Sequence, residues 1–266
     1  MAACGVTQGF VGWWMVASGL VDKKETKEID KTPRVSPYRL ATHAGFAYAL
    51  YTMTLWQAFN CLRRPAEFGV TLQNFEAIKK SRISVHRGIA LLPLVLLTGF
   101  FTAGISGGNA CNTFPFVGSD WFISYKHFHH DVPLWQNFTE NKLVVQVVHR
   151  TLASIMILGA SYHLLKGLKV GGYLAKSSRN TKIFSMLLLL TMYTQATIGI
   201  TSIYQSVPLH MASLHQIGAV SFLSILLLTM HSVRRSDPRH LRNLLGKLKV
   251  DNPQEYNKVM EQFRQR

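Results

Sequence analysis

The sequence has little charge, and most of that charge is basic. Only 16% of the 266 residues are charged, with 13 acidic residues against 29 basic ones and a formal net charge of +16. A soluble domain averages about 25% charged residues. Together with 48% hydrophobic residues gathered in long blocks, the low charge argues against a soluble domain and is typical of a membrane protein. The basic residues lie between the apolar blocks, so they indicate orientation and contact with anionic lipid rather than nucleic-acid binding.

Cysteine is scarce as well. Cys4, Cys61 and Cys111 lie far apart, and the sequence has no CxxC, CxxCH or zinc-ligand spacing. Cys111 stands alone in a loop, so that loop offers it no disulfide partner. The segment Met1–Leu20 lacks arginine and a basic n-region, which argues against a transit peptide and favours a membrane helix.

The alternating pattern of barrel strands is also missing. Instead there are six apolar segments, each near the ~20 residues that a helix needs to cross a bilayer. They are Ala2–Val21, Leu40–Leu62, Ile83–Ile105, Leu143–Leu165, Ile183–Tyr204 and Leu209–Met230. Only helices satisfy their backbone in lipid without closing a barrel, so we expect an all-α polytopic membrane protein with six transmembrane helices.

The loop charges predict the orientation. The linkers 63–82 and 166–182 and the tail after Met230 are rich in lysine and arginine, whereas the loop 106–141 has only Lys126. The basic linkers and the tail should therefore share the positive side. The first loop, 22–38, conflicts with this trend because it carries five basic residues, although four acidic residues nearly balance them.

An internal repeat is visible in two helix pairs. Thr7-Gln8-Gly9-Phe10-Val11-Gly12 resembles Thr194-Gln195-Ala196-Thr197-Ile198-Gly199, and each motif is followed by a helix with an early histidine, His43 or His215. Chance is the alternative to a true repeat. If the repeat is real, residues 83–233 form one complete four-helix half and residues 1–62 the last two helices of an earlier half. The linker 63–82 would then join the halves, and 234–266 would be a basic soluble tail.

Two histidines are expected at the same depth in the membrane. His149 and His215 each lie about seven residues inside a helix that enters from the sparsely charged side, or roughly 10 Å deep. Polar residues at such depth are costly and usually functional. A facing pair can ligate haem iron, whereas two histidines that merely bridge helices by hydrogen bonds are the alternative. His43 is the repeat equivalent of His215. Arg150 could bind a haem propionate or act as a structural ion-pair donor.

The other histidines suit less specific roles. Those at the positive-side helix ends are expected at the membrane interface with their polar atoms towards water. They are His86, His163 and His231. A cluster in the outer loop, His127, His129 and His130, could bind metal, but a solvated loop explains it better.

Several motifs resemble the haem A synthase family of the mitochondrial type, in the same order and over residues 5 to about 232. They are Gly12-Trp13-Trp14-Met15-Val16-Ala17-Ser18-Gly19-Leu20, Arg34-Val35-Ser36, Tyr38-Arg39-Leu40-Ala41-Thr42-His43, Asn112-Thr113-Phe114-Pro115, Asn137-Phe138-Thr139-Glu140-Asn141, Val145-Gln146, His149-Arg150 and Leu214-His215-Gln216. The chain departs from the family in the outer loop, where many members read Leu-Asp-Ala-Gly in place of Ile105-Ser106-Gly107-Gly108.

The resemblance implies an eight-helix membrane enzyme with two four-helix halves. Such an enzyme oxidises the C8 methyl group of haem O to a formyl group, which gives haem A for cytochrome c oxidase. His149 and His215 would ligate haem b, with Arg150 beside them, and His43 would be the catalytic-site ligand of the substrate haem O. The family's first two helices, with their Glu-x-x-His-Arg motif, are expected before residue 1, so we expect this chain to be inactive alone.

The same resemblance implies a place and partners. We expect a multi-pass protein of the mitochondrial inner membrane that contacts lipid, haem O, a ferredoxin-type electron donor, haem O synthase and a second copy of itself, and no nucleic acid. Two rivals remain: a membrane b-type cytochrome that transfers electrons without substrate chemistry, and a transporter or assembly scaffold without a cofactor.

The charge pattern yields a topology prediction. The tail after Met230 and the linkers 63–82 and 166–182 should face the mitochondrial matrix, and the loop 106–141 the intermembrane space. Protease added to mitoplasts should leave the tail intact until the inner membrane is opened. Digestion of the tail in intact mitoplasts would contradict the assignment.

Overall fold

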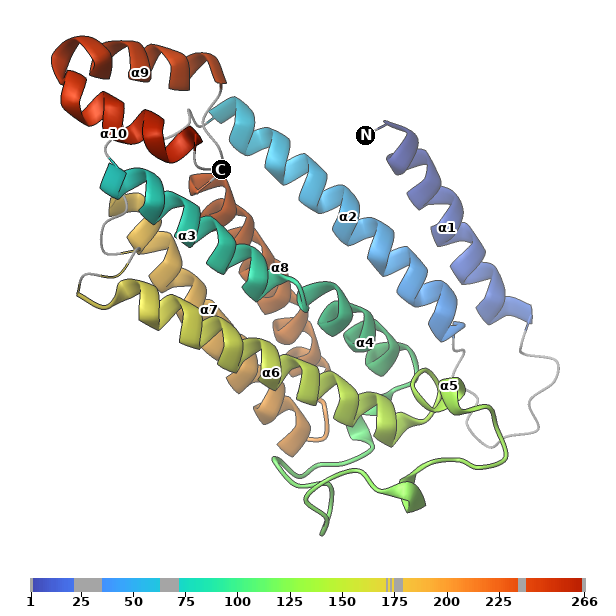
Figure 1. Ribbon diagram of the computed structural model, residues 1–266. Coiled ribbons are helices and arrows are strands. Elements are labelled where there is room, and N and C mark those ends of the chain that lie inside the picture. Colours follow the sequence, from blue (N-terminus) through green and yellow to red (C-terminus); the bar gives the residue numbers. More distant parts are fainter. Residues whose placement is uncertain are drawn as a thin grey trace. The chain divides into compact units, whose positions relative to one another are not determined.

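The protein is helical throughout the part that the structure describes. This computed structural model describes residues 2–21, 35–62, 72–170, 172, 174, 179–233 and 238–264, and no strand occurs among them. Figure 1 shows the α-helices and their order along the chain. They are α1 (Ala2–Val21), α2 (Pro37–Leu62), α3 (Leu72–Ile89), α4 (Leu92–Gly104), α5 (Leu134–Asn137), α6 (Lys142–Leu168), α7 (Arg179–Tyr204), α8 (Leu209–Ser232), α9 (Pro238–Asp251) and α10 (Pro253–Arg264).

Four spans among the described residues are long and apolar enough to cross a membrane. They are Lys79–Gly104, Lys142–Leu168, Arg179–Tyr204 and Leu209–Ser232. This confirms the prediction of an all-α polytopic membrane protein. Helices α1 and α2 have 20 and 26 residues, which is long enough, but they are diluted by polar residues such as Gln8 and Arg39. That these two helices also cross the membrane stays a prediction.

The helix expected over Ile83–Ile105 is interrupted, so the prediction of one continuous helix was wrong. Helix α3 ends at Ile89, and α4 begins at Leu92 after a turn at Ala90 and Leu91. Pro93 lies in the first turn of α4. Proline has no N–H to donate and its ring clashes with the carbonyl four residues earlier, which here belongs to Ile89. The chain therefore starts a new helix, where a proline in the first turn is tolerated.

The described contacts divide the chain into two compact units. Unit 1 comprises residues 1–55, 91–157 and 193–220, and unit 2 comprises residues 56–90, 158–192 and 221–266. Each unit is built from segments of several helices, and each is described here by itself. The predicted division at residues 62, 82 and 233 stays a prediction.

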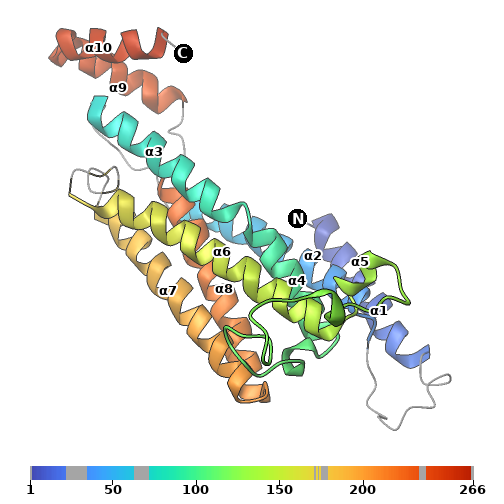
Figure 2. The same ribbon diagram turned by 60° about the horizontal axis from the view of Figure 1, so that its bottom comes forward.

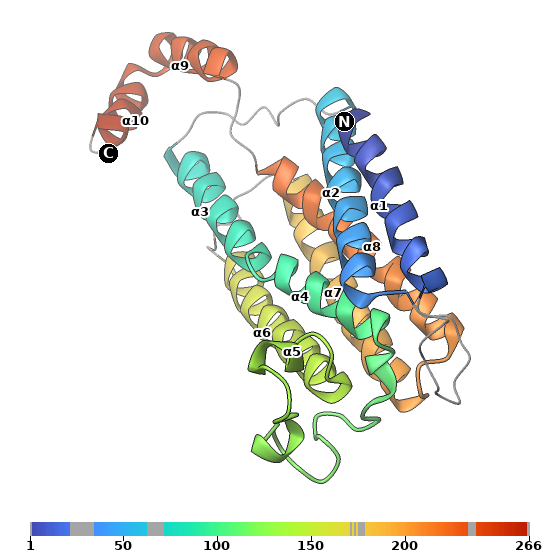
Figure 3. The same cartoon turned by 90° about the vertical axis from the view of Figure 1, so that its right-hand side faces the viewer.

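The core of unit 1 joins α2, α4 and α6. Ala41, Phe101 and Val145 are buried together, and the ring of Tyr38 packs edge-on against Phe101 with the ring centroids 5.5 Å apart. Helix α1 lies beside α2 (Figures 1 and 3), and Arg39 on α2 donates to the carbonyl of Trp14 at 2.9 Å. Unit 1 therefore holds the helices that carry His43, His149 and His215 in one packed body.

Within unit 2, His231 on α8 is buried, which corrects the expectation that it lies at the interface. Only 4% of His231 is exposed, and its Nε2 donates to Oδ1 of Asn60 at 3.1 Å. The rings of Trp56 and Phe59 pack on it with centroids 5.3 and 5.6 Å away. The last turns of α2 thus supply both a polar partner and an aromatic cage, which a helix-end position alone did not reveal.

The chain ends in two further helices of unit 2. Helices α9 and α10 lie side by side in Figures 1 and 2, and α10 contacts α3. Val259 on α10 is buried, whereas Val250 at the end of α9 is 80% exposed. The tail predicted as basic and soluble is therefore helical over residues 238–264, and residues 234–237 lie outside the described part.

The burial of His231 predicts a stability effect. His231→Ala removes a packed ring and one buried hydrogen bond, so it should lower the free energy of unfolding by about 2–3 kcal/mol. Thermal unfolding of the detergent-purified protein measures this. His210→Ala, on the same helix but exposed, is the control and should stay within about 0.5 kcal/mol of the parent. Equal effects of the two changes would refute the buried role.

Candidate functional site

The three histidines expected to bind haem all lie in unit 1. His43 is on α2, His149 on α6 and His215 on α8. The imidazoles of His149 and His215 lie close enough to interact electrostatically. The structure thus brings together two residues that are 66 positions apart in the sequence, because the first turns of α6 and of α8 both belong to unit 1.

His149 is held by α4 through one ring nitrogen. Its Nδ1 lies 3.0 Å from the carbonyl oxygen of Val95 and 3.1 Å from the hydroxyl of Thr98. A carbonyl can only accept, so Nδ1 carries the proton of the neutral ring and Nε2 keeps its lone pair. Histidines that ligate metals are usually held in this way, with the other ring N–H donated to a carbonyl or carboxylate.

His215 and His43 are held differently, each by a glutamine. Nε2 of Gln195 donates to the backbone oxygen of His215 at 2.9 Å and lies 3.1 Å from its Nδ1 and 3.3 Å from its Nε2. Nε2 of Gln8 donates to the backbone oxygen of His43 at 3.2 Å and lies 3.3 Å from its ring Nε2. These glutamines are the ones in the repeated Thr-Gln motif, so the two motifs make the same contact in space, as a true repeat requires.

Each of these two rings keeps one nitrogen for another partner. An amide has two N–H donors, and one of them is used on the backbone oxygen, so the amide can serve only one ring nitrogen. The side-chain oxygens of Gln8 and Gln195 and the Nδ1 of His43 are buried without a hydrogen-bond partner. Buried polar atoms are nearly always paired in proteins, so such a cluster points to a site that takes a ligand.

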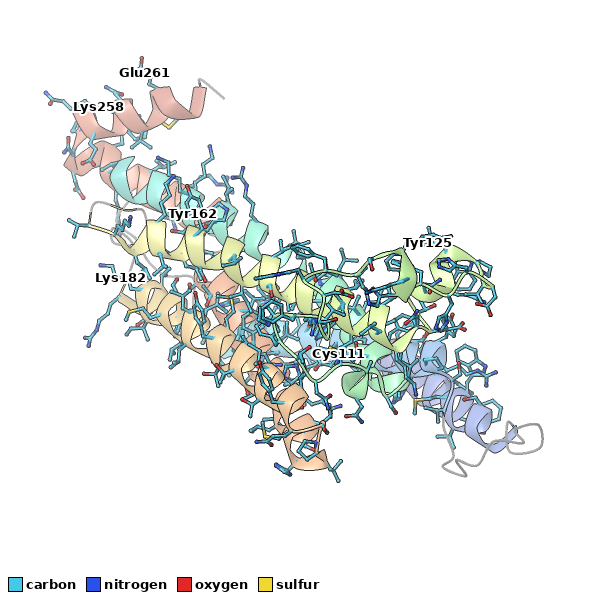
Figure 4. The ribbon with its side chains drawn as sticks, turned by 90° about the horizontal axis from the view of Figure 1, so that it is seen from below. Cys111, Tyr125, Tyr162, Lys182, Lys258 and Glu261 are labelled. Carbon is cyan, nitrogen blue, oxygen red and sulfur yellow. The ribbon has the colours of Figure 1, made fainter. Side chains whose placement is uncertain are left out.

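Side chains of α6 also bind the outer loop, residues 106–141, by hydrogen bonds. Nε2 of Gln146 donates to the carbonyls of Gly108 and Cys111 at 2.7 and 3.1 Å. Both terminal nitrogens of Arg150 donate to loop carbonyls, those of Thr113 and Phe116, at 2.8 and 2.9 Å. Figures 2 and 4 show the loop lying against the start of α6, with Cys111 labelled. Arg150 is therefore a loop anchor, and these bonds use two of its five N–H groups.

Two asparagines complete the loop. Oδ1 of Asn141 accepts from the backbone N–H groups of Leu143 and Val144, so Asn141 caps α6. Its Nδ2 donates to the carbonyl of His127 at 2.9 Å, and Asn137 bonds both backbone groups of His129. The sequence reasoning missed these anchoring roles and those of Gln146, Gln8 and Gln195. The available signal was a polar side chain within an apolar helix.

His127 and His130 of the outer loop have partners within the loop itself. Nδ1 of His127 bonds the backbone and hydroxyl of Ser124, and its Nε2 lies 3.3 Å from Oδ2 of Asp120. His130 stacks on Tyr125 with ring centroids 4.0 Å apart, and Figure 4 shows Tyr125 in this loop. No group of three or more histidine, cysteine or acidic side chains within the described ranges could hold a metal ion. A haem needs only two axial ligands, so this finding does not bear on haem.

Two loop groups have a shifted pKa. The hydrogen bond from Lys126, 2.7 Å away, lowers the pKa of Asp120. Burial acts to raise the pKa of the Cys111 thiol, but hydrogen bonding to Thr113, whose hydroxyl lies 3.1 Å from Sγ, and the positive charge of Arg150 outweigh it, so the pKa is lowered. The thiolate of Cys111 is therefore more abundant at neutral pH than that of an ordinary cysteine.

Comparison with known proteins identifies relatives of this sequence over most of its length. The family model of the cytochrome oxidase assembly proteins (COX15-CtaA) matches residues 1–227. Heme A synthase COX15 of Bos taurus is 36% identical over 239 residues, which cover 88% of this chain and 54% of the relative. Heme A synthase COX15 of Arabidopsis thaliana is 33% identical over 246 residues, or 91% of this chain and 50% of the relative.

A third relative is a fusion. The heme A synthase-mitochondrial ferredoxin fusion protein of Schizosaccharomyces pombe is 33% identical over 241 residues, which cover 82% of this chain and 38% of the relative. The chain spans about half the length of the curated heme A synthase COX15 relatives it matches. No solved structure matches it.

The lowered pKa of Cys111 predicts its reactivity. In a Cys4→Ala, Cys61→Ala background, the alkylation rate with iodoacetamide should rise with pH around a midpoint below the ordinary thiol value. Thr113→Val removes the hydroxyl and should move that midpoint up, whereas Thr113→Ser keeps the hydroxyl and should leave it in place. An identical midpoint in all three proteins would show that Thr113 does not stabilise the thiolate.

Proposed function

Because this chain belongs to the cytochrome oxidase assembly protein family (COX15-CtaA), we propose that it acts as part of a haem A synthase. In this proposal it is an oxidoreductase component that converts the C8 methyl group of haem O to a formyl group. The observation that carries the proposal is the neutral tautomer of His149, which leaves its Nε2 lone pair free in the same unit that holds His215.

The residues present fit a haem b between α6 and α8. Bis-histidine ligation needs two neutral imidazoles, each with an unused lone pair, on facing helices. The tautomer of His149 is fixed by the carbonyl of Val95, which leaves its Nε2 lone pair free. Ligation by His215 would use the ring lone pair that the second N–H of Gln195 otherwise faces, while the first N–H stays on the backbone oxygen. A bound haem b would supply one-electron redox chemistry. The protein's part is to hold the two rings at the required distance and in a dry environment.

We assign His43 to the substrate side. Its Nδ1 is buried without a partner and its Nε2 faces an N–H of Gln8, so ligation of a haem iron would take the ring lone pair in place of Gln8. His43 would bind the iron of haem O and so place the macrocycle for oxidation of its methyl group. Positioning of this kind can account for several orders of magnitude in rate.

Arg150 is the candidate propionate partner. Its guanidinium is one residue from His149 and is held by the carbonyls of Thr113 and Phe116. The remaining N–H groups could form charge-assisted hydrogen bonds to a carboxylate. In this assignment the outer loop fixes the guanidinium of Arg150. Arg150 in turn would fix the position of the macrocycle edge that carries the propionates.

The proposed cellular setting follows from the relatives. Relatives named heme A synthase COX15 and the fusion of one relative to a mitochondrial ferredoxin favour a multi-pass protein of the mitochondrial inner membrane that receives electrons from a ferredoxin-type donor. Membrane lipid, a second copy of the chain and haem O synthase are further proposed partners.

A b-type cytochrome without substrate chemistry is less favoured as the function. Mass analysis of the haem extracted from purified protein separates this cytochrome from a haem A synthase. Haem O or haem A in the extract would support the enzyme.

The ligand assignment predicts two spectra. His149→Ala and His215→Ala should each abolish the low-spin b-type bands in a reduced-minus-oxidised spectrum of purified protein, because each removes one axial ligand. His210→Ala, exposed on the same helix as His215, should leave those bands unchanged. If both alanine variants keep the parent spectrum, His149 and His215 are not the ligands.

A further inference from the structure

Three glycines meet histidine rings in the same way. A Cβ built on Gly12 would lie 2.9, 3.4 and 3.7 Å from Cε1, Nδ1 and Nε2 of His43. On Gly199 the same three distances to His215 are 2.9, 3.4 and 3.7 Å, and on Gly99 those to His149 are 3.0, 3.5 and 3.8 Å. The corresponding distances agree within 0.1 Å, although α4 lacks the Thr-Gln motif of α1 and α7.

The pattern selects these histidines among all those described. Among the glycines whose nearest atoms the structure describes, only Gly12, Gly99 and Gly199 have a histidine among the three atoms closest to the built Cβ, and the rings are those of His43, His149 and His215. In each case the helix with the glycine precedes the helix with the histidine: α1 and α2, α4 and α6, α7 and α8. The recurring element is therefore a pair of helices in which the earlier helix supplies a glycine and the later helix an imidazole.

Steric contact explains why each of these helix pairs has a glycine opposite its histidine. At Gly12 and Gly199 the closest ring atom would lie 2.9 Å from the Cβ, nearer than real Cβ atoms essentially ever come, so an alanine there would require the ring or the helix to move. At Gly99 the closest distance is 3.0 Å, and the ring of His149 would have to give by a few tenths of an ångström. Bare backbone is what allows the imidazole to lie against the neighbouring helix. Functional groups need placement within about 0.5 Å, so a displacement of the size of a methyl contact is enough to disturb iron ligation.

We propose that Gly12, Gly99 and Gly199 are positioning residues for the haem-ligating histidines, an inference that rests on the function proposed above. Each glycine sets how closely its imidazole approaches the neighbouring helix. A hydrogen-bonding partner then sets the rotation of the ring. For His149 this partner is the carbonyl of Val95, and for His43 and His215 it is a glutamine amide.

The glutamine beside His215 depends on a glycine as well. A Cβ on Gly218 would fall onto the side-chain oxygen of Gln195, 2.1 Å away. Gly218 lies on α8, one turn beyond His215, so α8 provides room for the amide that holds its own histidine. The site at His215 thus uses two glycines, Gly199 for the ring and Gly218 for the amide.

The chain contains matched controls for an alanine test. Nothing lies within 4 Å of a Cβ on Gly9 of α1 or on Gly159 of α6. Alanine is the better helix former, so Gly→Ala at any of these sites should not weaken the helix itself. Gly12→Ala is compared with Gly9→Ala, and Gly99→Ala and Gly199→Ala are compared with Gly159→Ala.

The experiment measures haem in the detergent-purified full chain. Gly99→Ala and Gly199→Ala should weaken haem b binding about 10- to 100-fold, the size expected when the support of a metal ligand is disturbed. The haem that remains should show altered low-spin electron paramagnetic resonance signals, since these depend on the orientation of the axial rings. Gly12→Ala should weaken titrated haem O by a similar factor without changing the haem b signal, and Gly9→Ala and Gly159→Ala should match the parent.

The outcomes separate this inference from the proposed function. A parent chain that binds no haem would overturn both. A parent chain that binds haem b, with Gly99→Ala and Gly199→Ala indistinguishable from Gly159→Ala in affinity and in signal, would overturn the positioning role alone. Should one variant fail to accumulate, the other acts on the opposite ligand and tests the same statement.

Discussion

An imidazole inside an apolar helix bundle needs a partner for its polar atoms and space for its ring, and the rest of this site depends on how the bundle provides both. Leaving a buried donor or acceptor unpaired costs about 1–3 kcal/mol. The ring of His149 has a backbone carbonyl of α4 as its partner, and one ring nitrogen each of His43 and His215 faces a glutamine amide of α1 or α7. In all three cases the neighbouring helix has a glycine where the ring approaches. Haem ligation, in our proposal, uses the free Nε2 lone pair of His149 and, at His215 and His43, the lone pair that otherwise faces the glutamine amide.

The two kinds of support differ in how firmly they fix the ring. A carbonyl accepts and never donates, so the proton on Nδ1 of His149 has one possible place. A glutamine amide has both an N–H group and an oxygen, and the oxygens of Gln8 and Gln195 are buried without partners. The amide can therefore offer either a donor or an acceptor when the protonation or ligation of His43 or His215 changes, whereas the carbonyl can only accept. This difference follows from the repeat, because the Thr-Gln motif occurs in α1 and α7 but not in α4.

The outer loop is coupled to the site through a single helix. Asn141 caps α6, Gln146 and Arg150 bind four loop carbonyls between them, and His149 lies between these two residues in sequence. A displacement of the loop would therefore act on the first turns of α6 and on the depth of His149. The lowered pKa of Cys111 arises in the same place, since Thr113 and Arg150 both act on its thiol.

The sequence by itself determined the class of the protein, because low charge and long apolar runs allow few structures other than a helical membrane bundle. It also determined the histidines worth considering, because polar residues deep in apolar segments are rare and depth follows from counting residues. Only the tertiary structure decided what each ring contacts. The aromatic contacts of His231 depend on packing between distant segments, whereas the break before Pro93 follows from the proline itself, a signal that was present in the sequence. The glycine beside each histidine is 16 to 50 positions away from it. No periodicity in the chain encodes such a pairing, because it arises only when one helix face is laid against another.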